Sequence, residues 1–352
     1  MAAVTVGAGA PIRRSRALRR RELTILAAVT VLVSLGLFAV TPLAGVADWL
    51  VFTTAAYALV QTSVSFAVEG RRRAADRLAG LGVRLAMVIA LIPLVAILYY
   101  VIAKGVRHLS GSFLTHDMAG VPIIGRAASG GGVEHAIIGT AEQVLIASLI
   151  AVPLGLLISV YVVEYGRGPF TTLIRFVMDV MTGVPSIVAG LFILAFWVLA
   201  LKQGVSGFAA GLALAILEIP IVMRSSEEML RLVPADLREA SYALGVPKWK
   251  TILRVVLPTA SAGIVTGVML AVARVTGETA PVLLAAQLTS SKNTNPFSGA
   301  QAGIGPFIYD QAKSSQAVAH DRAWAAALTL IVIILVLYVS ARVISTRRNK
   351  LS

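Results

Sequence analysis

The sequence predicts an all-α integral membrane protein, and its composition and charge pattern lead to this fold class. Of 352 residues, 57% are hydrophobic and only 14% are charged, whereas soluble domains are roughly half apolar and a quarter charged. The mean hydropathy is +0.85. The formal net charge of +14 is distributed between the apolar runs as membrane topology requires, which argues against a nucleic-acid partner. Because the chain has no cysteine, disulfides, zinc–thiolate sites and thiol catalysis are excluded.

Eight apolar runs are long enough to cross a bilayer as helices. About 20 residues span the hydrocarbon core, and a helix satisfies its backbone hydrogen bonds internally. The predicted spans are 23–43, 47–68, 81–103, 136–163, 173–200, 206–224, 258–280 and 323–343.

The first span resembles a secretory signal peptide, because a basic lead precedes it. The apolar core of a signal peptide is about 7–15 residues long, which is shorter than this run, so we expect an uncleaved anchor. If only one of the first two runs crossed the membrane, the basic clusters at 13–21 and 71–77 would face opposite sides. The positive-inside rule disfavours that arrangement. Two spans followed by a cytoplasmic linker are therefore expected, and eight spans in all place both termini of the chain in the cytoplasm.

These expectations divide the chain into five parts. They are a basic cytoplasmic tail at 1–22, an accessory transmembrane hairpin at 23–68, a cytoplasmic linker at 69–80, a six-span transport core at 81–343, and a basic cytoplasmic tail at 344–352. We expect the hairpin at the edge of the core. Within the core, the polar segment 225–257 is a cytoplasmic loop, and 285–321 is a long outer segment.

Charges within a span mark candidate substrate contacts, since an unpaired ion in hydrocarbon costs several kcal/mol. Arg274 and Glu278 lie four residues apart, which places them on one face of a continuous helix. Thr276 and Gly277 add polar groups and remove bulk between them. A guanidinium suits an oxyanion, and the carboxylate could hold it in place. The alternative is a structural ion pair.

The segment TGVPSIVAGL, residues 182–191, is a second candidate surface. Pro185 interrupts helical hydrogen bonding, while Gly183 and Ser186 permit close backbone approach or exposed amides. A simple helix kink is the alternative. Glu218 and the pair Arg175 and Asp179 are interpreted as structural.

The polar segment EASYALGVPKWKTILRVVLP, residues 239–258, fits the pattern EAA-x3-G-x9-I-x-L-P. Ser241 and Val255 are conservative departures from it. The spacing predicts a short helix with Glu239 and Ala240, a turn at Gly245, and a second helix that enters the membrane near Pro258. This pattern resembles the cytoplasmic coupling loop of ABC importer permeases.

The resemblance extends to the PstA family of phosphate ABC importer permeases. It rests on MRSSEEMLRLVPADLREASYALGVPKWKTILRVVLP, GIVTGVMLAVARVTGETAPVLL, GVPSIVAGL and GGVEHAIIGT. It covers about 81–343 and is strongest over 182–284, so the first 80 residues lie outside it.

The resemblance implies the type I ABC importer permease fold and a bacterial or archaeal cytoplasmic membrane. The implied partners are a second permease (PstC-like), an ATPase dimer (PstB-like), a phosphate-binding protein (PstS-like) and membrane lipids. ATP and Mg would bind the partner ATPase, because this chain lacks G-x4-G-K-[ST] and needs no cofactor of its own. The implied pathway or gating residues are Arg274, Glu278, Thr276, Gly183, Pro185 and Ser186. The implied coupling residues are Glu239, Ala240, Ser241, Gly245 and Pro258.

Other functions fit the sequence less well. The chain could be the partner permease or serve sulfate or molybdate. An ion-coupled secondary transporter would also have buried charges but has no use for the coupling loop. A membrane-embedded enzyme is disfavoured because His108, His116, His135 and His320 show no metal-ligand spacing. These four histidines are expected to be solvated.

Overall fold

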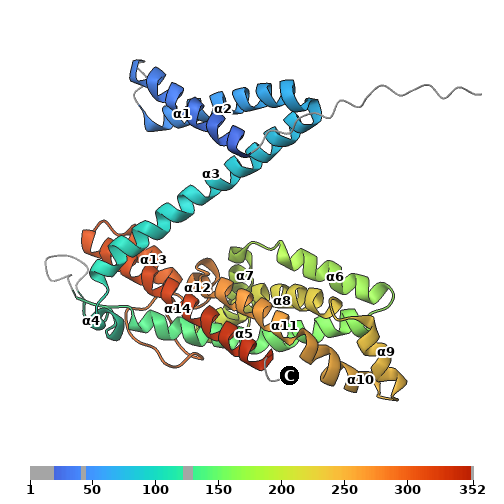
Figure 1. Cartoon of the computed structure of the whole chain (residues 1–352). Coiled ribbons are helices and arrows are strands. Elements are labelled where there is room, and N and C mark those ends of the chain that lie inside the picture. The colour runs from blue at the N-terminus through green and yellow to red at the C-terminus, as the bar shows by residue number, and fades with distance from the viewer. Residues whose placement is uncertain (1–19, 41–44, 122–129, 350–352) are drawn as a thin grey trace, which may run out of the picture. The chain divides into compact units, whose positions relative to one another are not determined.

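The computed structural model describes residues 20–40, 45–121 and 130–349, and these residues form helices joined by turns and loops (Figure 1). Contacts divide the chain into Met1–Leu98 and Tyr99–Ser352. The predicted tail 1–22 and the end of the first span at 41–43 lie largely outside the described residues.

The first unit is built from α1 (Arg20–Val40), α2 (Val46–Glu69) and the beginning of α3 (Arg71–His108). α1 packs along α2, where Thr53 Oγ1 donates to Ser34 Oγ at 2.9 Å in a buried contact. Gly70 separates α2 from α3 with φ +89°, a conformation that glycine adopts without strain. Most of the predicted linker 69–80 is therefore helical. The accessory role of the hairpin stays a prediction.

The turn at Gly70 is braced by a buried ion pair. The carboxylate of Glu69 accepts hydrogen bonds from Arg77 Nε at 2.6 Å, from Arg77 Nη2 at 2.7 Å and from Ser65 Oγ at 2.6 Å. The contacts satisfy a buried charge that would otherwise be costly.

The second unit is centred on α8 (Gly207–Arg231), which packs against α5 (Glu134–Val160), α6 (Pro169–Thr182), α7 (Ser186–Ile193), α11 (Leu257–Thr276) and α12 (Ala280–Ala285). Small residues allow this close packing, as is common between membrane helices. For example, a Cβ at Gly211 would lie 2.6 Å from Ile146 Cγ2 of α5. The remaining elements are α4 (Gly111–Thr115), η2 (Tyr161–Tyr165), η3 (Leu194–Ala200), α9 (Ala235–Ala243), α10 (Lys248–Thr251), η4 (Ile252–Val256), α13 (Ile304–Lys313) and α14 (Ala317–Asn349).

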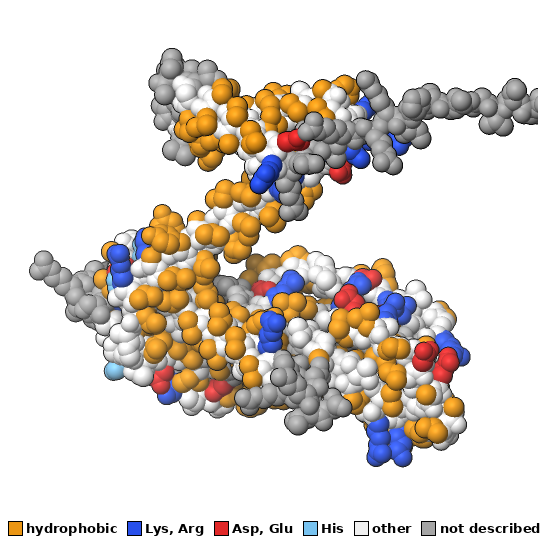
Figure 2. All heavy atoms as spheres, viewed as in Figure 1, with side chains coloured by type: hydrophobic (Ala, Val, Ile, Leu, Met, Phe, Trp, Pro, Cys, Tyr) orange, Lys and Arg blue, Asp and Glu red, His pale blue; other side chains and the backbone are white. Residues whose placement is uncertain are grey.

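Six helices among the described residues are long and apolar enough to cross a membrane, and α6 with the following helix would add a seventh. Hydrophobic side chains cover much of the visible surface of each unit (Figure 2). Many are large and exposed, such as Leu59 in the first unit and Leu149 in the second. The surface thus suits contact with lipid.

The predicted continuous span 173–200 is wrong in one respect, because the chain bends there. α6 and the helix Ser186–Ala200 meet at 101°. Gly183 ends α6, and Pro185 precedes α7 without an amide hydrogen that could continue the first helix.

The predicted span 258–280 is displaced along the chain, because the helical segment that could cross the membrane is Lys248–Thr276. α11 ends at Thr276, Gly277 follows as its C-cap, and Pro281 lies in the first turn of α12. A continuous helix would require an amide hydrogen at position 281 to bond the carbonyl of Gly277, and proline has none.

Candidate functional site

The segment 235–258 has the predicted shape of two short helices around a turn. α9 carries Glu239 and Ala240, the turn passes through Gly245 at φ +75°, and α10 and η4 lead into α11. Pro258 lies in the first turn of α11, where its missing amide hydrogen costs no helical bond. We call Ala235–Val256 the coupling loop.

Ser241 holds the two arms of the coupling loop together. Its buried hydroxyl lies 2.8 Å from Thr251 Oγ1 of α10. Its carbonyl also accepts from the amide of Val246 at 3.2 Å. Ser241 therefore acts within the loop, and the exposed Glu239 and Ala240 remain available to a partner.

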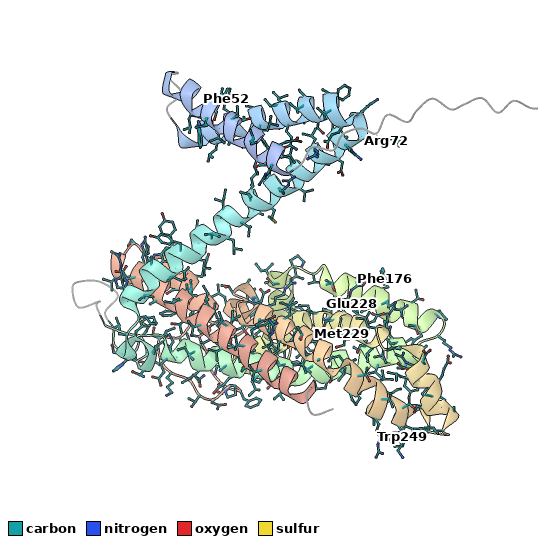
Figure 3. All side chains as sticks on the ribbon, viewed as in Figure 1. Phe52, Arg72, Phe176, Glu228, Met229 and Trp249 are labelled. Carbon is teal, nitrogen blue, oxygen red and sulfur yellow. The ribbon has the colours of Figure 1, made fainter. Side chains whose placement is uncertain are left out.

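Large apolar side chains of the coupling loop are exposed. Leu244 is 84% exposed and Trp249 is 59% exposed. Trp249 extends away from the ribbon of α10 (Figure 3). Large apolar side chains grouped on an exposed loop are typical of a surface that binds another protein.

The pathway candidates lie at the far end of α11. Arg274 is exposed, Glu278 is partly buried in the turn after the helix, and Thr276 is buried with its hydroxyl donating to the carbonyl of Val272 at 2.6 Å. Within the described residues, the side chains of Arg274 and Glu278 have no hydrogen-bond or ion-pair partner. The prediction of one helix face for this pair is wrong because the helix ends between them.

The two candidate segments for the pathway, 182–191 and 274–281, lie side by side, and the residues in contact, Gly190 and Pro281, are 91 positions apart in the chain. A Cβ at Gly190 of α7 would lie 2.7 Å from Pro281 Cα of α12. The preceding turn approaches α13, since a Cβ at Gly305 would lie 3.0 Å from the carbonyl oxygen of Glu278. Gly183 and Pro185 are exposed and Ser186 is partly buried at the bend before α7. The contacts join α7, which begins at the bend, to α12, and α13 to the turn that follows Arg274.

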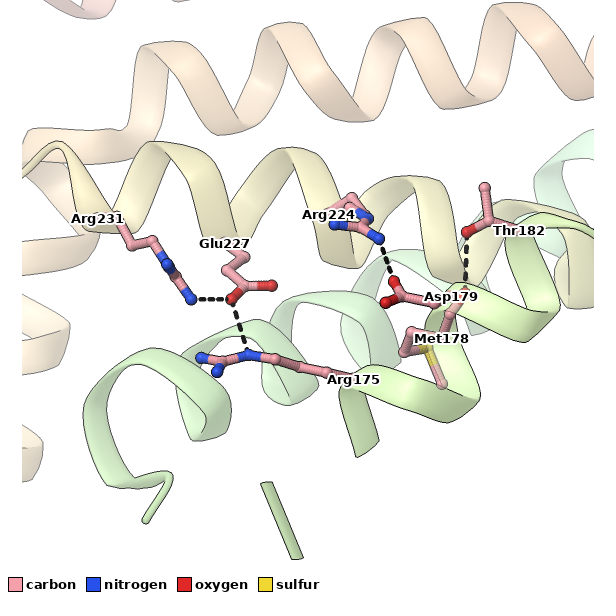
Figure 4. Close-up of polar contacts among 7 residues, drawn as sticks. All are labelled: Arg175, Met178, Asp179, Thr182, Arg224, Glu227 and Arg231. Carbon is pink, nitrogen blue, oxygen red and sulfur yellow. Dashed lines mark hydrogen bonds and ion pairs between the residues drawn. The ribbon is translucent and has the colours of Figure 1, made fainter. Parts of the chain in front are cut away.

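A cluster of charges joins α6 to α8 (Figure 4). Asp179 pairs with Arg224, while Glu227 Oε1 accepts from Arg175 Nε at 3.2 Å and from Arg231 Nη2 at 2.5 Å. These residues line a cavity of about 280 Å³. Arg175 and Asp179 thus pair with α8 rather than with each other. Sequence analysis missed the α8 charges, although their positions at 224, 227, 228 and 231 follow a helical period.

Two polar residues elsewhere are buried. Glu218 is fully buried in α8 and accepts from Ser148 Oγ of α5 at 3.0 Å, as expected for a structural residue. His135 is 2% exposed, and its ring meets the Phe307 ring edge-on at 5.3 Å. The prediction of a solvated His135 is wrong, since α13 covers it. The described residues contain no cluster of three or more histidines and acidic residues that could hold a metal ion.

Comparison with known proteins identifies the family. Residues 151–350 match the model "Binding-protein-dependent transport system inner membrane component". The "Phosphate transport system permease protein PstA 1" of Mycobacterium tuberculosis (strain ATCC 25618 / H37Rv) is 46% identical over 80% of this chain and 92% of its own length. The PstA protein of Yersinia pestis is 38% identical over 79% of this chain and 92% of its own length.

Among solved structures, an inward-facing MetNI methionine ABC transporter aligns with 62% of this chain and 94% of that chain. At 19% identity and a TM-score of 0.49, this likeness is too distant to transfer a residue's role.

The matched family model and the PstA relatives agree on a multi-pass inner-membrane subunit rather than an enzyme. The family model, at residues 151–350, also covers the coupling loop and the segments 182–191 and 274–281. The chain belongs to the binding-protein-dependent transport system inner membrane component family and, within it, to the PstA permeases.

Proposed function

We propose that this chain is a transmembrane permease subunit of an ATP-driven, high-affinity importer of inorganic phosphate and forms half of the translocation pathway. The similarity to phosphate transport system permeases over about four-fifths of the chain carries this conclusion. Together with the predicted first span in α1, which makes eight spans, the orientation that follows has both termini and the coupling loop in the cytoplasm, in agreement with the positive-inside rule.

Arg274 is our candidate for contact with phosphate in the pathway. Its exposed guanidinium has no partner within the described residues, and five N–H donors in a planar fork suit an oxyanion. Glu278 and Thr276 flank it, and Glu278 could accept a hydrogen bond from a protonated phosphate. The packing of Gly190 against Pro281 supports a joint role for the bend at 183–186 and the turn after Arg274 as a gate.

The coupling loop is our candidate for ATPase contact. Glu239, Ala240, Leu244 and Trp249 are exposed, while Ser241, Gly245 and Pro258 shape the loop. The partners in this proposal are a PstC-like permease, a PstB-like ATPase dimer and a PstS-like phosphate-binding protein. ATP and Mg belong to the ATPase, since the chain lacks the phosphate-binding loop G-x4-G-K-[ST].

The proposed mechanism is alternating access. ATP binding closes the ATPase dimer, shifts the coupling loop and opens the permease cavity outward to receive phosphate. Hydrolysis and product release restore the inward-facing state.

The experiment is phosphate uptake into proteoliposomes that contain this chain with its partner permease, ATPase and binding protein. We expect uptake that requires ATP in the wild type, and uncoupling or disassembly in Glu239→Ala. Uptake that follows an ion gradient without the ATPase would refute the proposal in favour of a secondary transporter. Uptake of sulfate or molybdate in place of phosphate would correct the substrate.

A further inference from the structure

Arg238, next to Glu239 in α9, is the most completely bonded arginine of the coupling loop among the described residues. Its Nε and Nη2 lie 3.0 and 2.9 Å from Glu164 Oε1 in η2, the π-helical end of α5. Its guanidinium also donates to the carbonyl of Leu230 at 2.9 Å and to that of Val233 at 2.6 Å. One side chain therefore joins the end of α5, the end of α8 and the first helix of the coupling loop.

The second arm of the coupling loop is bonded to the same place. The ammonium of Lys248 in α10 donates to the backbone carbonyl of Glu164. It also lies 4.8 Å from the centre of the Tyr165 ring, within the range of a cation–π contact. Both arms of the loop are thus tied to the two residues that end η2.

The ion pair between Glu164 and Arg238 is largely buried. The side chains of Glu164 and Arg238 are 5% and 18% exposed. In such surroundings a charged pair is weakly screened, and separating it leaves a buried carboxylate without its partner. A movement of the coupling loop that carries the end of α5 with it keeps this ion pair intact and therefore costs the least free energy.

α5 makes polar contacts along its length that lead toward the outer segment. Ser148 bonds Glu218 in α8. Further along α5, the side-chain nitrogen Nε2 of Gln143 donates to the backbone carbonyl of the fully buried Gln301 at 3.2 Å. Thr140 Oγ1 accepts from the amide of Ile304 at 2.8 Å. α5 is thus bonded to the coupling loop at its η2 end and to the segment at the beginning of α13 near its other end.

We propose that Glu164 and Arg238 are positioning residues that make the coupling loop and α5 move as one body, so that ATPase movement reaches the outer segment around Gln301 through α5. This inference rests on the proposed coupling of the chain to an ATPase. Neither residue touches the substrate in this account. Their loss should therefore separate ATP hydrolysis from transport.

The first test uses the assembled transporter in proteoliposomes with Glu164→Gln, which removes the negative charge at nearly constant size. Arg238 keeps its two carbonyl acceptors in this variant, so folding should survive. We expect the number of phosphate ions transported per ATP hydrolysed to fall on the order of tenfold, within the range usual for energetic coupling between two sites. ATPase turnover and the yield of the assembled complex should persist. Glu164→Asp should recover part of the loss.

Arg167→Gln is the matched control, because Arg167 is an exposed cation three residues from Glu164. It should leave transport and hydrolysis unchanged. If transport and hydrolysis fall in equal proportion in Glu164→Gln, or if neither changes, the positioning role is overturned. If wild type and Arg167→Gln both fail to take up phosphate, the proposed function fails instead, and the second test then decides the positioning role without reference to substrate.

The second test measures the distance between the two elements directly. The absence of native cysteine permits spin labels at Arg167→Cys and Ala235→Cys, both exposed positions beside η2 and in α9. We expect the same distance with and without ATP in the otherwise unchanged complex, and an ATP-dependent shift once Glu164→Gln is added. A shift already present without Glu164→Gln would show that α5 and the coupling loop separate during the cycle, and would overturn the inference.

Discussion

Arg238 and Arg274 lie at opposite ends of the same stretch of chain and have opposite surroundings. Arg238 is bonded to Glu164 and to two carbonyl groups, and its side chain is 18% exposed. Arg274 is exposed, and no described residue pairs with it. A fully bonded guanidinium fixes protein segments to one another, whereas an unbonded one is available to an anion or to a partner subunit. Under the proposed function, Arg238 positions the coupling loop and Arg274 contacts the transported anion.

The largest expected difference between the two arginines is in stability, when each charge is removed in turn. Arg238→Met should strongly lower the apparent Tm of the purified complex, because it leaves the buried Glu164 without its partner, at a cost of about 3–5 kcal/mol. Arg274→Met should leave Tm nearly unchanged. Thermal unfolding in detergent measures both, and equal losses of Tm would contradict the distinction.

Packing next to Arg274 gives the second prediction. Gly190→Val should destabilise the protein by about 1–3 kcal/mol, since its side chain would meet the backbone of Pro281 at a built Cβ distance of 2.7 Å. Phosphate uptake should also fall, because the valine side chain would displace the turn after Arg274.

Gly82→Val, in α3, is the matched control for Gly190→Val. Its Cβ would meet nothing within 4 Å, and Gly82 lies outside the proposed gate. Both variants can be compared by chemical denaturation and uptake. A tolerated Gly190→Val would mean that α7 and α12 are not held together as the structure has them.

The smallest expected effect lies within the coupling loop. Ser241→Ala removes the buried contact with Thr251 and should cost about 1 kcal/mol, with transport per ATP unchanged. Alanine is also the residue that the EAA pattern has at this position. Ser261→Ala, whose hydroxyl is exposed, is the control for denaturation. A loss of transport larger than in Glu239→Ala would show that Ser241 acts on the ATPase directly.

Local sequence patterns predicted much of the fold but not the long-range contacts. The coupling loop was predictable because Gly245, Pro258 and the apolar run after them act on their immediate neighbours. Pro185 indicated an interruption, but the 101° bend depends on how α6 and α7 each pack. Glu278 was misplaced because helical spacing holds only where the helix continues. The pairing of Glu164 with Arg238 joins residues 74 apart, which no local pattern reveals.

In the proposed function, the positive charge at position 274 serves the anion pathway. Arg274→Cys tests it in a chain without native cysteine, in the proteoliposome uptake assay. We predict that uptake is lost, that a cationic methanethiosulfonate reagent partly restores it, and that an anionic reagent of similar size does not. Undiminished uptake in Arg274→Cys, or equal recovery with both reagents, would contradict the account.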